Sequence, residues 1–280
     1  MIRDITIGQY YEADSPVHVL DPRTKILGTM LYIVCIFLAK NIWGLLAAAL
    51  GIVIVIRLSK VPFRFIVRGL KSIVFILMFT AVLNLFLEKG HVLVSFWIFT
   101  ITWEGLRNAL LIAVRLVLLI FGSSMMTLTS TPLQLAAGLE RLMGPLKKIK
   151  VPVHDISMMI SIALRFIPVL LEETDRIMKA QKARGADFEN GKLMEKLRSL
   201  VPIFVPLLLS LFRRAEELAL AMESRCYRGD EGRTKMNVLQ YQRKDRIAGL
   251  FLLLFLGIII ALRFLPGLFT LLGQWMGMAL

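Results

Sequence analysis

Long runs of apolar residues constrain the fold of this chain more than any other feature of its sequence. They occupy the stretches 26–39, 42–56, 73–87, 109–128 and 247–265. Each run is long enough, or nearly so, to cross a bilayer as a helix. None alternates in the manner of a membrane β-strand. Since 57% of the residues are hydrophobic, more than in an ordinary soluble domain, the sequence predicts an all-α, polytopic helical membrane protein.

The first apolar block, 26–56, is long for one helix and is interrupted at Lys40 and Asn41. We predict two short spans here, because a single span would put the five basic residues of 57–71 on the outside. The third span is expected at about 73–87 and the fourth at about 106–129. Between them, 92–103 (VLVSFWIFTITW) is too short to span and is expected to be interfacial or re-entrant. Arg115 in the fourth span should face protein, a water-filled cavity or a headgroup.

The net charge of +14 raises nucleic acid as a partner, but the distribution of the charge argues against it. Of the 34 basic residues, 29 fall in the segments 1–25, 57–71 and 132–246. This is the positive-inside pattern of a plasma-membrane protein. We therefore place these three segments and the N-terminus in the cytoplasm. We expect membrane lipid as a partner, through attraction to its anionic headgroups, and no nucleic acid.

The segment 132–246 differs from the rest, since its apolar residues are interleaved with charged ones. Five prolines divide it, and we predict helices at about 132–143, 153–167, 168–185, 192–201 and 206–226. Amphipathic helices of this kind are expected to lie on the membrane surface or on one another rather than to span. The predicted organisation is an N-terminal arm with about four transmembrane helices (1–131), a cytoplasmic helical domain (132–246) and a last transmembrane helix (247–280).

Motifs of catalysis and of metal or cofactor binding are missing from the sequence. His18, His91 and His154 lack metal-ligand spacing, and Cys35 and Cys226 suggest neither a disulfide framework nor a metal cluster. The chain has no P-loop for ATP and no Gly-x-Ser-x-Gly nucleophile elbow. We expect no metal, no cofactor and no enzymatic activity.

Two arginines stand at the ends of amphipathic helices in the cytoplasmic domain. Arg184 lies in KAQKARGADFENGK (179–192) and Arg225 in LAMESRCYRGDEG (220–232). Either arginine alone is explained by a favourable position at the negative end of the helix dipole, with Gly185 as a left-handed cap. Two such sites in one domain favour a second interpretation, in which each guanidinium captures a carboxylate on another protein.

Three stretches carry a resemblance to a known family. LDPRTKILG (20–28), ARGA (183–186) and AMESRCYRG (221–229) resemble the T component of energy-coupling factor (ECF) transporters, a CbiQ-like transmembrane protein. The resemblance covers nearly the whole chain. It implies a non-catalytic transmembrane scaffold of a vitamin or metal-ion importer of the ABC type. Its partners would be two soluble ATPase subunits and a small membrane-embedded substrate-binding subunit.

The resemblance also assigns docking residues at the two helix ends, which the family uses as coupling helices. In that family each arginine docks in a groove of one ATPase subunit. The first motif corresponds to Ala183, Arg184 and Gly185 here. The second corresponds to Ser224, Arg225 and Cys226, where the cysteine departs from the family's glycine. The helix is therefore expected to run on as far as Arg228 and Gly229, and Arg228 to share or replace the docking role.

The apolar surface of the coupling domain is the predicted contact for the substrate-binding subunit. Its candidate stretches are 156–171 and 201–212, with Met158, Met159 and Ile162 as the named contacts. Methionine-rich surfaces adapt to several partners, although packing within the domain explains at least half of these residues. In the N-terminal motif a structural role is expected for Asp21, Pro22, Arg23 and Lys25. A helix start with Asp21 as N-cap, Pro22 in the first turn and basic flanking residues accounts for it.

Two other classes of function stay open. One is a membrane-bound enzyme that holds a phosphorylated or lipid substrate on its basic face. The other is a conventional importer subunit with its own substrate pocket, for which Asn84, Asn108 and Arg115 are the modest candidates. Co-isolation with two ATPases and a small hydrophobic subunit would separate these classes from the transporter scaffold.

Overall fold

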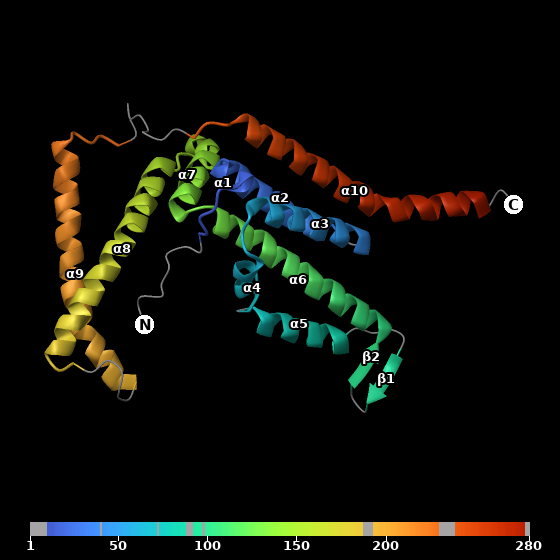
Figure 1. The fold of residues 1–280 in the computed structure, drawn as a ribbon, viewed down its shortest axis with the longest axis horizontal. Helices are drawn as coiled ribbons and strands as arrows, with labels where there is room; N and C mark the ends of the chain where they lie inside the picture. The colour runs from blue at the N-terminus through green and yellow to red at the C-terminus, as the bar shows by residue number, and fades with distance from the viewer. Residues whose placement is uncertain are drawn as a thin grey trace. The chain divides into compact units, whose positions relative to one another are not determined.

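The computed structural model describes residues 10–39, 41–71, 73–87, 92–96, 99–186, 193–229 and 239–277. Most of this part of the chain is helical (Figure 1), which confirms the predicted all-α class. The chain divides into two compact units, which are described separately below. The core unit comprises Gly8–Leu139 with Leu239–Leu280, and the α8–α9 unit comprises Glu140–Val238 with Met1–Ile7.

The elements of the core unit are α1 (Pro16–Val19), α2 (Pro22–Leu38), α3 (Ile42–Ser59), α4 (Phe63–Lys71), α5 (Val74–Leu87), β1 (Val92–Phe96), β2 (Phe99–Thr102), α6 (Trp103–Thr129), most of α7 (Pro132–Leu142) and α10 (Arg243–Gly277). The first apolar block forms two separate helices, α2 and α3, as predicted, and the crossing of the membrane by both stays a prediction. Helices α2, α3, α6 and α10 pack side by side (Figure 1). Their buried residues include Cys35, Ile36, Ala48, Leu128 and Ile259.

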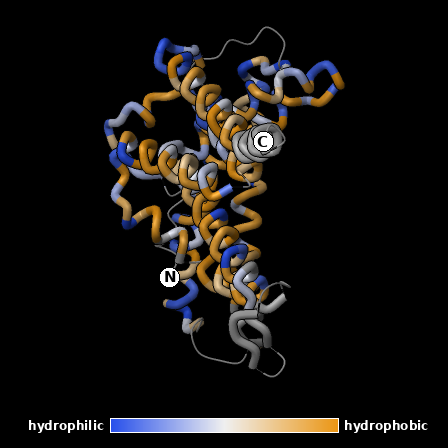
Figure 2. Tube along the Cα trace, turned by 90° about the vertical axis from the view of Figure 1, so that its right-hand side faces the viewer, coloured by the Kyte–Doolittle hydropathy of each residue, from blue (hydrophilic) through white to orange (hydrophobic). Residues whose placement is uncertain are grey.

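The helices of the core unit consist mostly of hydrophobic residues, as Figure 2 shows, and many of these side chains are exposed. On α5, for example, Phe75 is 79% exposed and Met78 is 63% exposed. Side chains of this kind are stable on the outside of a helix only where lipid or another protein covers them. Four described helices are long and apolar enough to cross a membrane, at Ile42–Ser59, Gly105–Thr129, Val153–Ala183 and Arg243–Phe264, and α5 contains a shorter apolar helix. The chain is a multi-pass membrane protein.

A β-hairpin forms in the segment 92–103, for which an interfacial or re-entrant position was predicted but no strands. Val92–Phe96 pairs antiparallel with Phe99–Thr102, with Ser95 opposite Thr100 and an irregularity between Val92 and Val94. The β-branched and aromatic residues of VLVSF and FTIT favour strands, a signal that the prediction passed over. The side chain of Thr102 then caps α6 by accepting a hydrogen bond from the Gly105 N–H at 3.1 Å.

The α8–α9 unit corrects the prediction that prolines divide the helices of 153–226. It contains the end of α7, the 3-10 helix η2 (Gly144–Ile149), α8 (Val153–Ala183) and α9 (Leu193–Ser224). Pro168 lies inside α8, and Pro202 and Pro206 lie inside α9. The four predicted helices are therefore two, and the last span, predicted at 247–265, is also longer, since α10 extends from 243 to 277.

A contact between the two long helices shows how α9 tolerates Pro206. Proline has no N–H, so the carbonyl of Pro202, one turn earlier, loses its partner in the helix. The Gln181 side-chain amide of α8 donates a hydrogen bond to that carbonyl at 3.4 Å. The neighbouring helix thus satisfies the group that the proline leaves unpaired. Because α8 is continuous, it is long enough to span, contrary to the prediction that no helix of this segment could.

Candidate partner-docking helix ends

The end of α8 has the backbone geometry of a Schellman motif. Arg184 is the C-cap residue, and Gly185 follows with φ of +87° in the left-handed region. The Gly185 N–H donates to the Lys182 carbonyl at 3.0 Å, and the Ala186 N–H to the Gln181 carbonyl at 3.0 Å. This pair of hydrogen bonds defines the motif. The left-handed glycine cap predicted at this helix end is confirmed.

The end of α9 repeats this geometry residue for residue. Cys226 has φ of 54°, and its N–H donates to the Glu223 carbonyl at 2.8 Å. The Tyr227 N–H donates to the Met222 carbonyl at 3.1 Å. Arg225 therefore occupies the position that Arg184 occupies in α8, and Cys226 the position of Gly185. The helix ends at Ser224, so the expectation that it runs on to Arg228 and Gly229 is wrong.

Both arginine side chains are exposed and accessible. Within the described residues, Arg184 and Arg225 form no ion pair. A side chain added at Gly185 would meet nothing within 4 Å, so the backbone around the first arginine is open to a partner. Ala183 and Ser224 immediately precede the two arginines and are also exposed.

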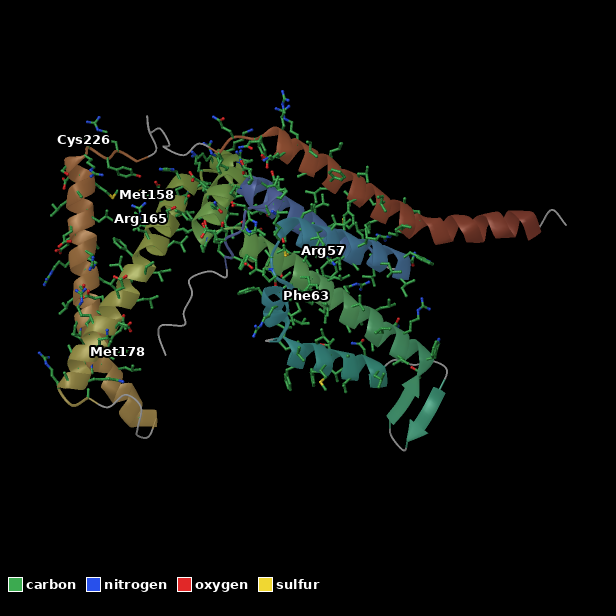
Figure 3. The ribbon with its side chains drawn as sticks, in the orientation of Figure 1. Arg57, Phe63, Met158, Arg165, Met178 and Cys226 are labelled. Atoms are coloured by element: carbon green, nitrogen blue, oxygen red, sulfur yellow. The ribbon has the colours of Figure 1, made fainter. Side chains whose placement is uncertain are left out.

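The two tips lie at opposite ends of an antiparallel helix pair (Figure 3). The Tyr227 hydroxyl donates to Met158 Sδ at 2.9 Å, which places the end of α9 beside the start of α8. Gln181 contacts Pro202 at the other end of the pair. From Met158 to the tip of α8 is about 40 Å at the helical rise of 1.5 Å per residue. The two arginines therefore lie far apart, at opposite ends of the helix pair.

Arg228 lies in a different environment from the two tips. With Gly229 it lines a cavity of about 310 Å³ at the start of α8, shared with Lys147, Val151, Pro152, Val153, His154 and Asp155. His154 Nδ1 is 3.3 Å from Glu140 Oε1, and Ser157 donates to Glu140 Oε2 at 2.9 Å. These contacts fix the start of α8. Gly229 is also left-handed, with φ of +79°, but Arg228 lies beyond the end of α9 and lines this cavity, whereas Arg184 and Arg225 each directly follow the last residue of a long helix.

The predicted contacts for a substrate-binding subunit differ in their surroundings. Met159 is 61% exposed on α8, whereas Met158 and Ile162 are partly buried. Met158 holds the end of α9 through Tyr227. Packing within the α8–α9 unit therefore accounts for the partial burial of Met158. The exposed side chain of Met159 is available to another protein or to lipid.

The N-terminal motif forms a polar cluster in the core unit. Asp21 caps α2 by accepting a hydrogen bond from the Arg23 N–H at 2.9 Å, and Pro22 follows in the first turn, as predicted. The Arg23 guanidinium pairs with Asp21 at 2.9 Å, donates to the Leu239 carbonyl at 2.8 Å and lies 4.2 Å from the Tyr241 ring centroid. Arg23 thereby ties the start of α2 to the segment that precedes α10.

Lys25 and Asp245 complete this cluster. The Lys25 ammonium donates to the carbonyls of Thr129, at 2.7 Å, and His18, at 3.1 Å. Burial lowers the pKa of Lys25 to about 8, because desolvation disfavours the charged form. Asp245 accepts hydrogen bonds from the N–H groups of Asp21 and Gln242, both at 2.8 Å. The cluster joins the start of α2, the end of α6 and the start of α10, and sequence reasoning missed Thr129, Leu239 and Asp245 as its members.

Two of the three polar residues considered for a substrate pocket, Asn84 and Arg115, bond to backbone groups. The Arg115 guanidinium donates to the carbonyl of Ala39 at the end of α2, at 2.9 Å. It faces protein, one of the environments predicted for it. The Asn84 amide donates to Thr80 in its own helix at 2.8 Å. Neither interaction directs a polar group into a shared cavity.

Comparison with known proteins shows to which protein family the chain belongs. The family model described as "CbiQ: Cobalt transport protein" matches residues 13–236. Among curated relatives, a protein of Clostridium kluyveri is 52% identical over 252 residues, covering 89% of this chain and 93% of the relative. One from Ruminiclostridium cellulolyticum is 51% identical over 245 residues, covering 88% and 92%. One from Lactococcus lactis subsp. cremoris is 45% identical over 247 residues, covering 88% and 93%.

These three relatives carry the same name, energy-coupling factor transporter transmembrane protein EcfT. The chain belongs to the CbiQ family, and the resemblance to the transmembrane component of ECF transporters is confirmed. It is a transporter component rather than a catalyst.

Proposed function

We propose that this chain couples two soluble ATPase subunits to a separate, small membrane-embedded subunit that binds a vitamin or a metal ion. The ATPases bind and hydrolyse ATP. Their closure displaces the helix ends at Arg184 and Arg225, and α8 and α9 carry this motion to the substrate-binding subunit in the plasma membrane. The proposal assigns no catalytic residue and no cofactor to the chain itself.

The repeated geometry of the two helix ends is the observation that carries this proposal. An exposed arginine precedes a left-handed residue at the end of each long helix. A guanidinium held on a rigid helix end is suited to bidentate binding of a carboxylate on another protein. The separation of about 40 Å, from the helical rise, supports one ATPase per arginine. Arg225, rather than Arg228, is the proposed second docking residue.

The contacts of the core unit support the proposed orientation. The Tyr11 N–H donates to the Leu128 carbonyl at 2.9 Å, and the Tyr11 ring lies 5.1 Å from that of Phe65. The N-terminal arm, α4 and the end of α6 therefore lie together, as four crossings between 22 and 129 require. We place this side in the cytoplasm because it carries the excess of basic residues. We also place α8 and α9 there, since the charged second half of α8 is costly to bury in lipid.

Co-isolation tests this proposal directly. The tagged chain is expressed with its two candidate ATPases and a candidate substrate-binding subunit, and the purified material is analysed by native mass spectrometry. We expect one copy of this chain with two ATPase chains and one small membrane subunit. Purification of the chain alone in an active, substrate-binding state would instead support a conventional importer subunit or an enzyme.

The apolar surface is tested by comparing neighbouring methionines. Met159→Lys changes an exposed side chain and is expected to release the substrate-binding subunit while the ATPases stay bound. Met158→Lys removes the contact with Tyr227 and is expected to disturb the second tip and weaken ATPase binding. Release of the ATPases by Met159→Lys would show that this surface serves packing within the chain.

A further inference from the structure

We propose that the segment Arg57–Lys71 is a binding site for the phosphate headgroups of anionic membrane lipids. The segment connects α3 with α5 and contains the nine-residue helix α4. Both flanking helices are apolar. A connection between two membrane helices lies at the membrane surface, where it meets lipid headgroups. This inference does not depend on ATPase coupling.

The charge of the segment is entirely of one sign. It contains Arg57, Lys60, Arg64, Arg68 and Lys71 and no acidic residue, and no Asp or Glu occurs between Asp21 and Glu88. The side chains of Arg57, Lys60 and Arg64 are exposed. In the described part of the chain, none of these three pairs with an acidic side chain. The protein therefore presents these cations to an anion from outside the chain.

The turn that carries the cations is fixed by buried groups. Ser59 is fully buried, and its hydroxyl donates to the Ile56 carbonyl at 2.8 Å and accepts the Val61 N–H at 3.4 Å. Lys60 follows in the left-handed region, with φ of 56°. Val61 and Ile66 are 5% and 0% exposed and belong to the hydrophobic core. A fixed turn holds its basic side chains near one another at little entropic cost.

Apolar side chains beside the cations identify lipid as the source of the anion. Phe63 is 57% exposed and Leu58 is 50% exposed, and Figure 3 marks Phe63 and Arg57 on the two sides of the turn. In α4 the basic positions 64, 68 and 71 share one helical face, while Phe63, Val67 and Leu70 lie next to it. Apolar rings flanked by basic residues are typical of a helix at the boundary of headgroups and acyl chains. If the site bound a phosphate ion from water instead of a lipid, the side chains of Phe63 and Leu58 would stay exposed to water.

The test measures lipid retained by the full-length chain. The chain is reconstituted in nanodiscs of equal phosphatidylcholine and phosphatidylglycerol, extracted in mild detergent, and its retained lipid is quantified by mass spectrometry. The variant Arg57→Gln/Lys60→Gln/Arg64→Gln is compared with Lys148→Gln/Lys179→Gln/Arg213→Gln, which removes the same charge from exposed positions of the α8–α9 unit. One basic residue near an anionic surface changes affinity about fivefold. We therefore expect the first variant to lose phosphatidylglycerol enrichment by a factor of ten or more, and the control to keep it.

A charge-conserving variant separates binding from folding. Arg57→Lys/Arg64→Lys should retain the enrichment, because a lysine also binds a headgroup as a point charge. Equal losses in the two glutamine variants would overturn the proposal, since the effect would then be one of net charge. Displacement of the lipid by millimolar glycerol phosphate would show a site for a soluble anion. Full enrichment of the first variant together with loss of co-isolated ATPases would identify the segment as a protein interface.

Discussion

Cys226 adopts a left-handed backbone conformation that side-chain-bearing residues rarely occupy. Its φ of 54° completes the cap of α9, as the φ of +87° of Gly185 completes that of α8. The sequence predicted the first cap because glycine marks it. It did not predict the second, since a cysteine carries no such signal and only the hydrogen bonds of Cys226 and Tyr227 reveal the motif. The equivalence of Arg184 and Arg225 is therefore a result of backbone geometry.

The cap of α9 predicts the effect of restoring glycine. Cys226→Gly should raise the thermal midpoint, because the left-handed conformation costs a residue with a side chain about 1–2 kcal/mol. The greater freedom of glycine in the unfolded chain offsets part of this gain. Cys226→Ser is the matched control, since serine has a side chain of similar size and should leave the midpoint unchanged. A lower midpoint for the glycine variant in detergent melting experiments would contradict the assigned cap.

The lowered pKa of Lys25 predicts that the stability of the folded protein depends on pH. Its pKa is about 8 in the folded protein and about 10.4 in an unfolded chain. Between these values the unfolded state binds more protons, so stability rises with pH through this window and is unaffected below it. We expect the melting temperature of the wild type, relative to Lys25→Met, to increase from pH 7.5 to pH 9.5. A constant or falling difference would show that Lys25 is not buried as a partly neutral amine.

At the scale of the elements, the apolar runs correctly predicted the helices of the core unit. The prolines wrongly predicted breaks within α8 and α9. A proline removes one hydrogen bond and disfavours helix before it, but long helices that pack on each other override this local preference. The contact of Gln181 with Pro202 is a tertiary interaction, which spacing along the chain does not disclose. The hairpin at 92–102 was not predicted for another reason, because length and hydropathy indicate only that this segment is too short to span and do not disclose strand pairing.

The close packing of α6 on α2 predicts that a larger side chain at their contact lowers the stability of the protein. A Cβ atom added at Gly122 would lie 2.6 Å from the ring of Tyr32, which is buried in the core. Gly122→Ala should therefore destabilise the protein by roughly 1–3 kcal/mol through overpacking. Gly249→Ala in α10 is the control, since nothing lies within 4 Å of its added Cβ. Equal melting temperatures of the two variants would contradict the close approach of α2 and α6.

At the scale of the whole molecule, the proposed coupling of ATPases to transport requires the end of α8 to lie on the cytoplasmic side of the membrane. The helix is long and apolar enough to cross, whereas we propose from the charge distribution that both of its ends lie in the cytoplasm. Two exposed positions, Trp103 at the start of α6 and Lys179 near the end of α8, report on this topology.

Labelling with a membrane-impermeant maleimide distinguishes the two topologies. Trp103→Cys and Lys179→Cys are made separately in a Cys226→Ser background, in which the remaining Cys35 is buried. We expect the reagent to label position 103 from outside intact cells and position 179 only after the cells are opened. Labelling of both from outside would mean that α8 crosses the membrane.

Substrate uptake by arginine variants of the assembled transporter tests the central claim most directly. The double variant Arg184→Ala/Arg225→Ala is compared with Arg176→Ala/Arg213→Ala, which removes two exposed arginines from the sides of the same helices, at matched membrane levels. Removing one partner of a buried interfacial charge pair costs about 2–5 kcal/mol, whereas a cation that only faces a helix dipole contributes about 0.3–1 kcal/mol. We predict that the first variant abolishes uptake, that lysine at either position restores it only in part, and that the control transports normally. Near-normal uptake by Arg184→Ala/Arg225→Ala would contradict the account.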